Sequence, residues 1–231
     1  MLRASVIVFP GSNCDRDVKV ALERTIGAKV AMVWHNDASV PASDIIVIPG
    51  GFSYGDYLRC GAMAAHSAIM RDVVAKAKAG TPVLAICNGF QVVTEAGLLP
   101  GVLMRNASLR FSCRDVTMKV EQTDTAFTNA YKKDQVIRIP IAHAEGNYFT
   151  DAQTHARLEG EGRVVLRYCD SAGNVTPAAN PNGALANIAG ICDERRRVVA
   201  MMPHPERLYE PALGGSDGRA VFESAVGALV G

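Results

Sequence analysis

The sequence predicts an α/β fold: a doubly wound, mostly parallel sheet with helices on both faces and a strand-rich C-terminal half. Two observations predict it. In the first half, short apolar runs alternate with segments of helical pattern, which is typical of parallel strands buried on both faces. In the second half, strand-like runs follow one another, which indicates partly antiparallel pairing. The chain of 231 residues shows no repeat or linker, so we expect a single domain over residues 1–231.

The strands of the first half are apolar runs that end where glycine-rich or polar loops begin. They are expected over Ser5–Phe9, Lys29–Trp34, Asp44–Ile48 and Val83–Ile86. Helices are expected between them, over Asp15–Ile26, over an alanine-rich segment that follows the loop Pro49–Gly61 and ends at Gly80, and over Asn88–Ala96. Gly27 marks the end of the first helix.

Strand patterns dominate the second half. Strands are expected over Arg114–Glu121, Gln135–Ile141, Val164–Tyr168, Ala184–Cys192 and Val198–Met202. We expect no helix among them, because a clear helical pattern returns only in Gly218–Val230.

Composition excludes several classes of function. The formal net charge is +1, which gives no electrostatic footprint for nucleic acid or a membrane surface. No run approaches the roughly 18 apolar residues of a membrane span, and the apolar start of the chain is too short for a signal peptide. We therefore expect a cytoplasmic protein without nucleic-acid or membrane partners.

The six cysteines form no C-x-x-C pair, so neither a zinc site nor a redox pair is indicated and no metal is expected. Five of them are expected to be free, mostly buried thiols: Cys14, Cys60, Cys113, Cys169 and Cys192.

Cys87 is different because it lies between a predicted strand and a predicted helix. Val83–Ile86 leads into it, and a helix is expected to begin at Asn88. Such a sharp turn, a nucleophile elbow, holds a side chain at the carboxyl edge of the sheet. The helix N-terminus places partial positive charge beside the sulfur, which favours the thiolate. The sequence therefore predicts an enzyme with Cys87 as its nucleophile.

A thiolate nucleophile needs a base, and the base needs an orienting group. His204 and Glu206 flank Pro205 directly after the apolar strand Val198–Met202. Pro205 pushes His204 towards an extended conformation, in which residues two apart point to one side. Glu206 is therefore expected to orient the imidazole of His204 at the same sheet edge as Cys87.

Negative charge that develops on a substrate needs backbone donors. We expect the amides of Gly51 or Phe52, which end the third strand, and of Asn88 to form an oxyanion hole. An ordinary strand-ending turn is the alternative at Gly51 and Phe52. Gln91 lies one helical turn after Cys87 and is a candidate for substrate binding, although its amide could instead cap the helix or face water.

Two other patterns compete with this assignment. Residues 51–55 read G-F-S-Y-G and match the serine elbow G-x-S-x-G, but a loop rather than a helix is expected after Ser53. His143 and Glu145 form a second H-x-E after a predicted strand and could supply the base instead. The lack of a locking proline there makes His204 the preferred base.

Four segments together carry a resemblance to a known family. They are F-P-G-S-N-C-D at 9–15, P-G-G-F-S-Y-G-D at 49–56, C-N-G-F-Q at 87–91 and P-H-P-E at 203–206. The sequence resembles the glutaminase subunits of phosphoribosylformylglycinamidine synthase, a family of triad-type, class I glutamine amidotransferases of purine biosynthesis. A class I glutamine amidotransferase-like fold is implied by this resemblance.

The resemblance implies a triad of Cys87 as nucleophile, His204 as general base and then acid, and Glu206 as orienting group. Glutamine would be hydrolysed to glutamate and ammonia. The ammonia would pass to a synthetase subunit, where ATP and Mg²⁺ serve the conversion of formylglycinamide ribonucleotide to its amidine, and a small third subunit would complete the complex. No cofactor is expected in this chain, which contains neither G-x-x-x-x-G-K-[ST] nor a G-x-G-x-x-G after a strand.

Two positions depart from the family pattern. Ala85 replaces the first glycine of G-x-C-x-G, and Ala144 replaces the glycine of H-G-E-G-N-Y. Alanine at 144 would be strained if that position needs a positive φ. Two other functions stay open: a stand-alone cysteine hydrolase or peptidase of the same fold, and a catalytically silent binding module.

Overall fold

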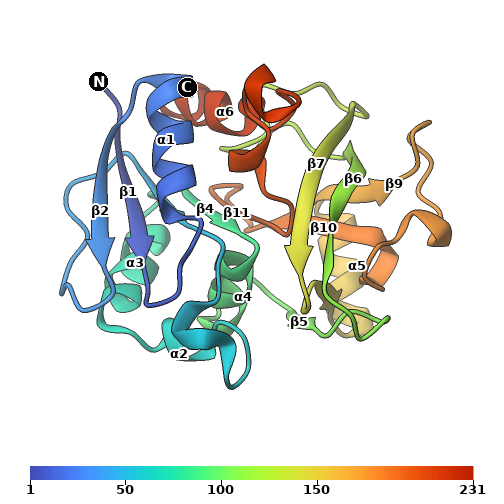
Figure 1. Cartoon of the computed structure of the whole chain (residues 1–231), viewed down its shortest axis with the longest axis horizontal. Coiled ribbons are helices and arrows are strands. Elements are labelled where there is room, and N and C mark those ends of the chain that lie inside the picture. Colours follow the sequence, from blue (N-terminus) through green and yellow to red (C-terminus); the bar gives the residue numbers. More distant parts are fainter. Residues whose placement is uncertain (231) are drawn as a thin grey trace.

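The computed structural model describes residues 1–230, and one sheet of nine strands runs through this part of the chain (Figure 1). The order of its strands is β2-β1-β3-β4-β11-β10-β9-β6-β7. Their bounds are β1 Arg3–Val8, β2 Lys29–Trp34, β3 Ile45–Ile48, β4 Val83–Ile86, β6 Ser112–Val120, β7 Val136–His143, β9 Val164–Cys169, β10 Ile188–Cys192 and β11 Val198–Met201. A separate antiparallel pair joins β5 (Val102–Met104) and β8 (Asn147–Phe149).

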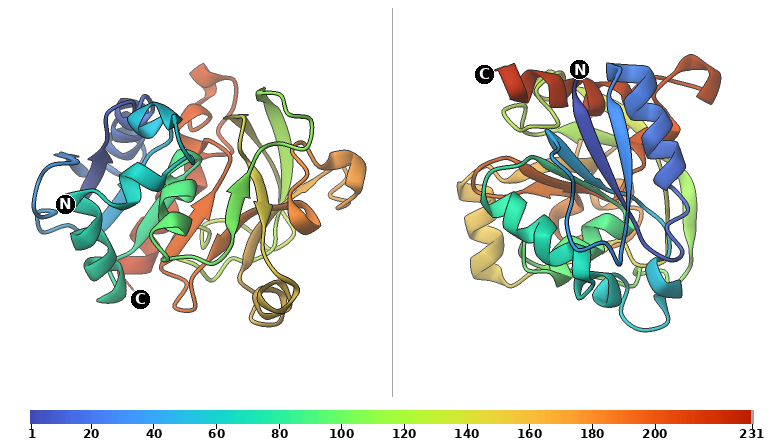
Figure 2. Two further views of the ribbon diagram at one scale, coloured as in Figure 1. Left: turned by 90° about the horizontal axis from the view of Figure 1, so that it is seen from below. Right: turned by 90° about the vertical axis from the view of Figure 1, so that its left-hand side faces the viewer.

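The five strands from β2 to β11 are parallel to one another, and from β11 onwards each pairing is antiparallel. Six α-helices are described: α1 (Asp15–Ile26), α2 (Ala62–Ala65), α3 (Ala68–Lys78), α4 (Asn88–Glu95), α5 (Ala152–Gly160) and α6 (Arg219–Val230). Figure 2 shows α1 and α3 on opposite faces of the parallel half. The predicted doubly wound, mostly parallel fold class is confirmed, including the strand-rich second half.

Burial explains the two kinds of pairing. Every residue of β3, β4 and β11 is buried, because these short apolar strands are covered on both faces. In β7, buried residues alternate with more exposed ones, as expected for a strand with one face towards water. The single domain over residues 1–231 stays an expectation, and Gly231 lies outside the described residues.

Three sequence expectations need correction. A helix, α5, does interrupt the second half: Asp151 caps it, its side chain accepting a hydrogen bond from the backbone N–H of Thr154 at 2.9 Å. The alanine-rich segment forms two helices, α2 and α3, rather than one. The strand expected from Ala184 begins only at Ile188, because Leu185–Asn187 forms a 3₁₀ turn. Other element ends differ by one or two residues.

The order of the strands brings the sequence motifs together at one edge of the sheet. Since β4 lies between β3 and β11, the loops that follow these three strands meet at one carboxyl edge. These loops contain the glycine-rich segment, Cys87 and His204. Within the described residues, none of the helices has the length and apolar character to cross a membrane.

Candidate active site

Cys87 forms a strained turn between β4 and α4. Its φ of 51° and ψ of −104° are unusual for a residue with a side chain. The turn is held because its N–H donates to the carbonyl of Met201 at 2.7 Å, on the neighbouring strand β11. Gly89 is required in this turn, since a Cβ there would lie 2.1 Å from the carbonyl oxygen of Ile48. The predicted elbow is therefore present in the backbone.

The two departures from the family pattern are accommodated. Ala85 is fully buried and is in register with Ile48 on β3 and Ala200 on β11, so its methyl group is part of the core. Ala144 is not among the described residues with a positive φ, so its Cβ brings no left-handed strain to the loop.

His204 and Glu206 form a buried pair directly after β11. The Nδ1 of His204 lies 2.6 Å from Oε1 of Glu206, and the two side chains are 3% and 0% exposed. Burial lowers the pKa of His204, but the charges of Glu206 and Cys87 outweigh it and hold that pKa well above its ordinary value. Among described residues, the Nε2 of His204 has no hydrogen-bond partner. This nitrogen is therefore free to exchange a proton with a reacting group.

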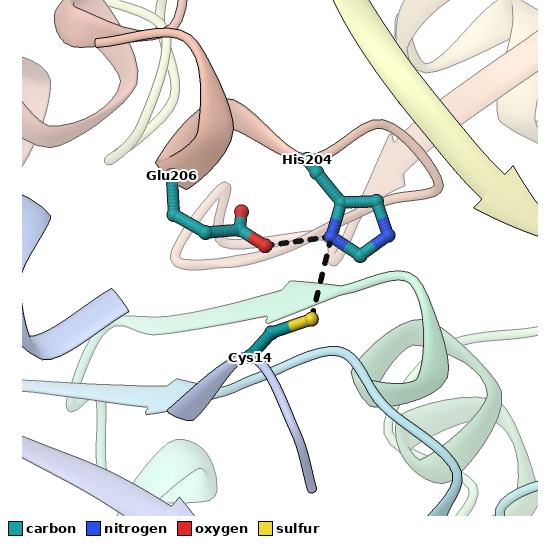
Figure 3. A group of neighbouring side chains, drawn as sticks. All are labelled: Cys14, His204 and Glu206. Atoms are coloured by element: carbon teal, nitrogen blue, oxygen red, sulfur yellow. Dashed lines mark hydrogen bonds and ion pairs between the residues drawn. The ribbon is translucent and has the colours of Figure 1, made fainter. Parts of the chain in front are cut away.

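Cys14 is a neighbour of this pair that the sequence did not reveal. Its Sγ lies 3.9 Å from Nδ1 of His204 (Figure 3). It also accepts a hydrogen bond from Nη2 of Arg207 at 3.3 Å. Arg207 in turn pairs with Asp17 at 3.0 Å. Cys14 is 190 residues away from His204 in the chain, so no local pattern could have joined them.

A thiol, an imidazole and a carboxylate are also ligands that zinc accepts. The candidate ligand atoms of Cys14, His204 and Glu206 all lie within 4.8 Å of one another. However, Nδ1 is already paired with Glu206, and the guanidinium of Arg207 places positive charge against Cys14. We interpret the group as a hydrogen-bonded cluster, and the absence of a metal stays a prediction.

Cys87 lines a cavity of about 170 Å³ at the carboxyl edge of the sheet. Cys87 itself is 5% exposed, and its Sγ lies 3.8 Å from the carbonyl oxygen of Ala142, to which the thiol can donate. Other residues lining the cavity are Gly51, Phe52, Asp56, Gln91 and Glu145.

The expected oxyanion donors differ in availability. The N–H of Phe52 donates to the carbonyl of Gly11 at 2.9 Å, so it is occupied in this structure. The N–H of Gly51 has no such partner among described residues, and that of Asn88 is one of the free donors in the first turn of α4. Gly51 has a φ of +141°, which favours glycine. Gly51 and Asn88 are therefore the donors that the geometry leaves free.

Gln91 is buried beside the cavity with both ends of its amide engaged. Its Nε2 donates to the carbonyl of Glu145 at 2.7 Å, and its Oε1 accepts from Nδ2 of Asn88 at 2.7 Å. These bonds tie α4 to the loop that follows β7. Its role in substrate binding stays a prediction.

The competing base and nucleophile lie in unfavourable environments. His143 is buried between Asn106 and Asn182, and burial, followed by the charge of His204, lowers its pKa to about 4. It is thus neutral near pH 7. Ser53 begins a short 3₁₀ turn rather than preceding an α-helix, and its N–H donates to Oδ1 of Asn88 at 3.1 Å. His143 therefore lacks the carboxylate partner that His204 has, and Ser53 lacks the strand-to-helix turn that contains Cys87.

Apolar side chains are exposed on the loop that contains Phe52, a residue that lines the cavity. Phe52 stacks on Phe111 with ring centroids 6.5 Å apart, and Tyr57 and Leu58 follow in the same loop as Phe52. Tyr57 is 89% exposed and Leu58 is 71% exposed. Apolar surface of this kind typically marks an interaction site.

Comparison with known proteins identifies the family. The sequence model of the CobB/CobQ-like glutamine amidotransferase domain matches residues 1–214. The phosphoribosylformylglycinamidine synthase subunit PurQ of Novosphingobium aromaticivorans is 57% identical, over 98% of this chain and 97% of that protein. The chain belongs to the PurQ family of glutamine amidotransferases. A further member, from Moorella thermoacetica, is 55% identical over 97% of this chain and 95% of its own.

Solved structures agree with this family assignment. A chain in the structure of PurLQS from Thermotoga maritima matches with a TM-score of 0.87 and 43% identity, covering 99% of this chain and 100% of that chain. The glutaminase domain of a Trypanosoma brucei CTPS with bound acivicin shares the fold, with a TM-score of 0.61 at 14% identity over 100% of this chain and 94% of its own.

Proposed function

We propose that this chain is the glutaminase subunit of phosphoribosylformylglycinamidine synthase, and that it hydrolyses glutamine through Cys87, His204 and Glu206. The observation that carries the proposal is the buried pair of His204 and Glu206 at the end of β11, next to the strand that ends at Cys87. Its membership of the PurQ family supports the assignment.

The first half of the reaction forms a thioester. The thiolate of Cys87 attacks the side-chain carbonyl carbon of glutamine, and the oxygen, now negative, accepts hydrogen bonds from the amides of Gly51 and Asn88. His204 carries the proton on Nε2 and gives it to the leaving nitrogen, so that ammonia departs. The C–N bond breaks as the γ-glutamyl thioester forms.

The second half removes the thioester. A water molecule gives a proton to Nε2 of His204 and attacks the same carbonyl carbon. Collapse of the oxyanion breaks the C–S bond, releasing glutamate and restoring the thiolate of Cys87. Throughout, Glu206 holds the Nδ1 proton at 2.6 Å and stabilises the charged imidazole.

We propose that the ammonia passes to a synthetase partner that uses ATP and Mg²⁺, with a small third subunit completing the complex. The relatives are named as subunits of this synthase, and the Thermotoga maritima structure is one of PurLQS. The exposed apolar loop at Tyr57 and Leu58 is a suitable docking surface. The proposal also includes glutamine as the substrate and the cytoplasm as the location. It assigns no cofactor to this chain.

The test is a reconstituted complex with the Cys87→Ser variant. Synthesis of the amidine from glutamine should be abolished, while synthesis from added ammonia should continue, because only the nucleophile is altered. Cys113→Ser is the matched control, since this thiol is exposed. Equal loss with both nitrogen sources, or unchanged use of glutamine, would contradict the proposal.

The same complex tests the alternatives. A stand-alone hydrolase predicts strong glutamine hydrolysis that the synthetase does not change. A silent binding module predicts that a glutamine-analogue alkylating agent leaves Cys87 unlabelled even with the partners present.

A further inference from the structure

The cavity that contains Cys87 is also lined by two carboxylates, Asp56 and Glu145. No lysine or arginine lines it among the described residues. Arg105 approaches Glu145 only to 3.8 Å, with a side chain that is 77% exposed. The cavity thus combines a nucleophile with two carboxylates, and among the described residues only Glu145 of the two has a salt-bridge partner, the exposed Arg105.

The charge of Glu145 acts on Asp56 in this cavity. Burial raises the pKa of Asp56, and the charge of Glu145 raises it further. The thiol of Cys60 lies with them, and its pKa is raised first by burial and then by Glu145 and Asp56. Like charges close together are unfavourable without a cation between them. A bound cation would therefore be stabilised here.

Side chains of the helix that begins after Cys87 contact the carboxylate of Asp56 and the backbone of Glu145. The Nδ2 of Asn88 donates to Oδ1 of Asp56 at 3.4 Å. The amide of Gln91 donates to the backbone carbonyl of Glu145 at 2.7 Å. Cys87 and Gln91 are each 5% exposed in the wall of the same cavity. Contacts from α4 therefore hold Asp56 and the backbone at Glu145 beside the cavity that Cys87 lines.

The backbone around Asp56, which lines the cavity, is strained. Tyr54, Gly55 and Asp56 all have positive φ values, of 55°, 81° and 51°. Left-handed conformations cost roughly 1–3 kcal/mol for residues with side chains. Such strain persists only where surrounding contacts hold it; here Tyr54 Oη lies 2.6 Å from Nδ1 of His35, and the N–H of Tyr54 donates to the carbonyl of Pro10.

We propose that Asp56 and Glu145 bind the α-ammonium group of the amino-acid substrate. This inference rests on the proposed function, in which the side-chain amide of glutamine lies at Cys87. The substrate then extends from Cys87 towards the carboxylates, and its α-ammonium supplies a cation within the cavity, where no lysine or arginine lines the wall among the described residues. The pair selects amides that carry an α-ammonium group over analogues of the same length that lack it.

The experiment compares two substrates on the reconstituted complex. One is L-glutamine, and the other is glutaramate, which has hydrogen in place of the α-ammonium. The kcat/KM for ammonia release is measured with both substrates for the wild type, Asp56→Asn and Glu145→Gln. Asp124→Asn is the control, since that side chain is 61% exposed and pairs with Arg196 outside the cavity.

The proposal predicts that each cavity variant loses at least about tenfold in kcat/KM for glutamine, mainly through KM, because ground-state binding is weakened. The same variants should turn over glutaramate at least as efficiently as the wild type does. The preference for glutamine then falls at least about tenfold in both variants and not in the control. The ratio of the two kcat/KM values does not depend on how much of a variant is folded, since both substrates are measured on one preparation.

If the variants turn over glutaramate too slowly, protection of Cys87 from iodoacetamide by each compound gives the same ratio as dissociation constants. An unchanged ratio in both variants, with normal turnover of glutamine by the wild type, overturns the subsite and leaves the proposed function intact. A wild-type complex that releases no ammonia from glutamine overturns both.

Discussion

The parallel and antiparallel halves of the sheet contribute to the site in different ways. The parallel half supplies Cys87 and His204 from the ends of the adjacent strands β4 and β11, both fully buried. The antiparallel half supplies His143 and Glu145 from the end of β7, a strand whose residues alternate in exposure. The parallel edge therefore holds the proposed reactive groups, whereas the residues that follow β7 line the same cavity and bring a carboxylate to it.

The largest expected difference between the two edges concerns their histidines. His204→Ala should lower glutamine-dependent kcat/KM by roughly 10³-fold or more, because it removes the only base that Glu206 orients. His143→Ala should cost far less, since His143 is neutral and held by asparagines. Steady-state ammonia release by the complex measures both. The reverse order would move the base to the antiparallel edge.

The next comparison is between alanine substitutions of one glycine in each half of the chain. Gly89→Ala should destabilise the protein by more than about 3 kcal/mol, because the new Cβ meets backbone that cannot move easily. Gly160→Ala at the end of α5 should be neutral or slightly stabilising, since no atom lies within 4 Å of that Cβ and its φ is not positive. Urea unfolding compares them. If the two variants had equal free energies of unfolding, the elbow at Cys87 would be less tightly packed than described.

Acid should destabilise the protein through His143 on the antiparallel edge. Its pKa is about 4 when folded, against an ordinary value of 6.5, so between these values the unfolded chain binds a proton that the folded chain does not. Stability therefore falls as the pH falls from 6.5 towards 4, by about 2 kcal/mol between pH 7 and pH 5. Urea unfolding at both pH values should show a smaller fall in His143→Gln. An identical fall in the two proteins would contradict this assignment.

The smallest effect is expected at Ser53, the competing serine of the parallel edge. Its Oγ is buried and has no hydrogen-bond partner among described residues, so Ser53→Ala removes no bond. Activity with glutamine should stay within about threefold of the wild type. A loss comparable to that of Cys87→Ser would revive the serine nucleophile.

The parallel half could largely be predicted from the sequence because its signals are local. Continuous apolar runs identify β3, β4 and β11, and the change from strand to helix pattern identifies the elbow at Cys87. The spacing of His204 and Glu206 around Pro205 predicts that the two side chains meet, and they do, at 2.6 Å. Only the adjacency of β4 and β11 depends on topology.

The remaining features depend on contacts between distant segments. Cys14 reaches His204 across 190 residues, and Asp56 and Glu145 line one cavity although they lie far apart in the chain. The hydrogen bond from Phe52 to Gly11, which occupies an expected oxyanion donor, is also non-local. α5 was missed although Asp151 is a favourable capping residue, because its short amphipathic pattern is weak. Sequence periodicity carries no information on such pairings.

The central claim is that the sulfur of Cys87 forms a covalent bond to the substrate. Mass spectrometry of the complex, quenched with acid during glutamine turnover, tests it most directly. A γ-glutamyl adduct should appear on the peptide that contains Cys87, and it should be absent in Cys87→Ser. Continuing turnover without any adduct on Cys87, or an adduct on Cys14 or Cys60 instead, would contradict the account.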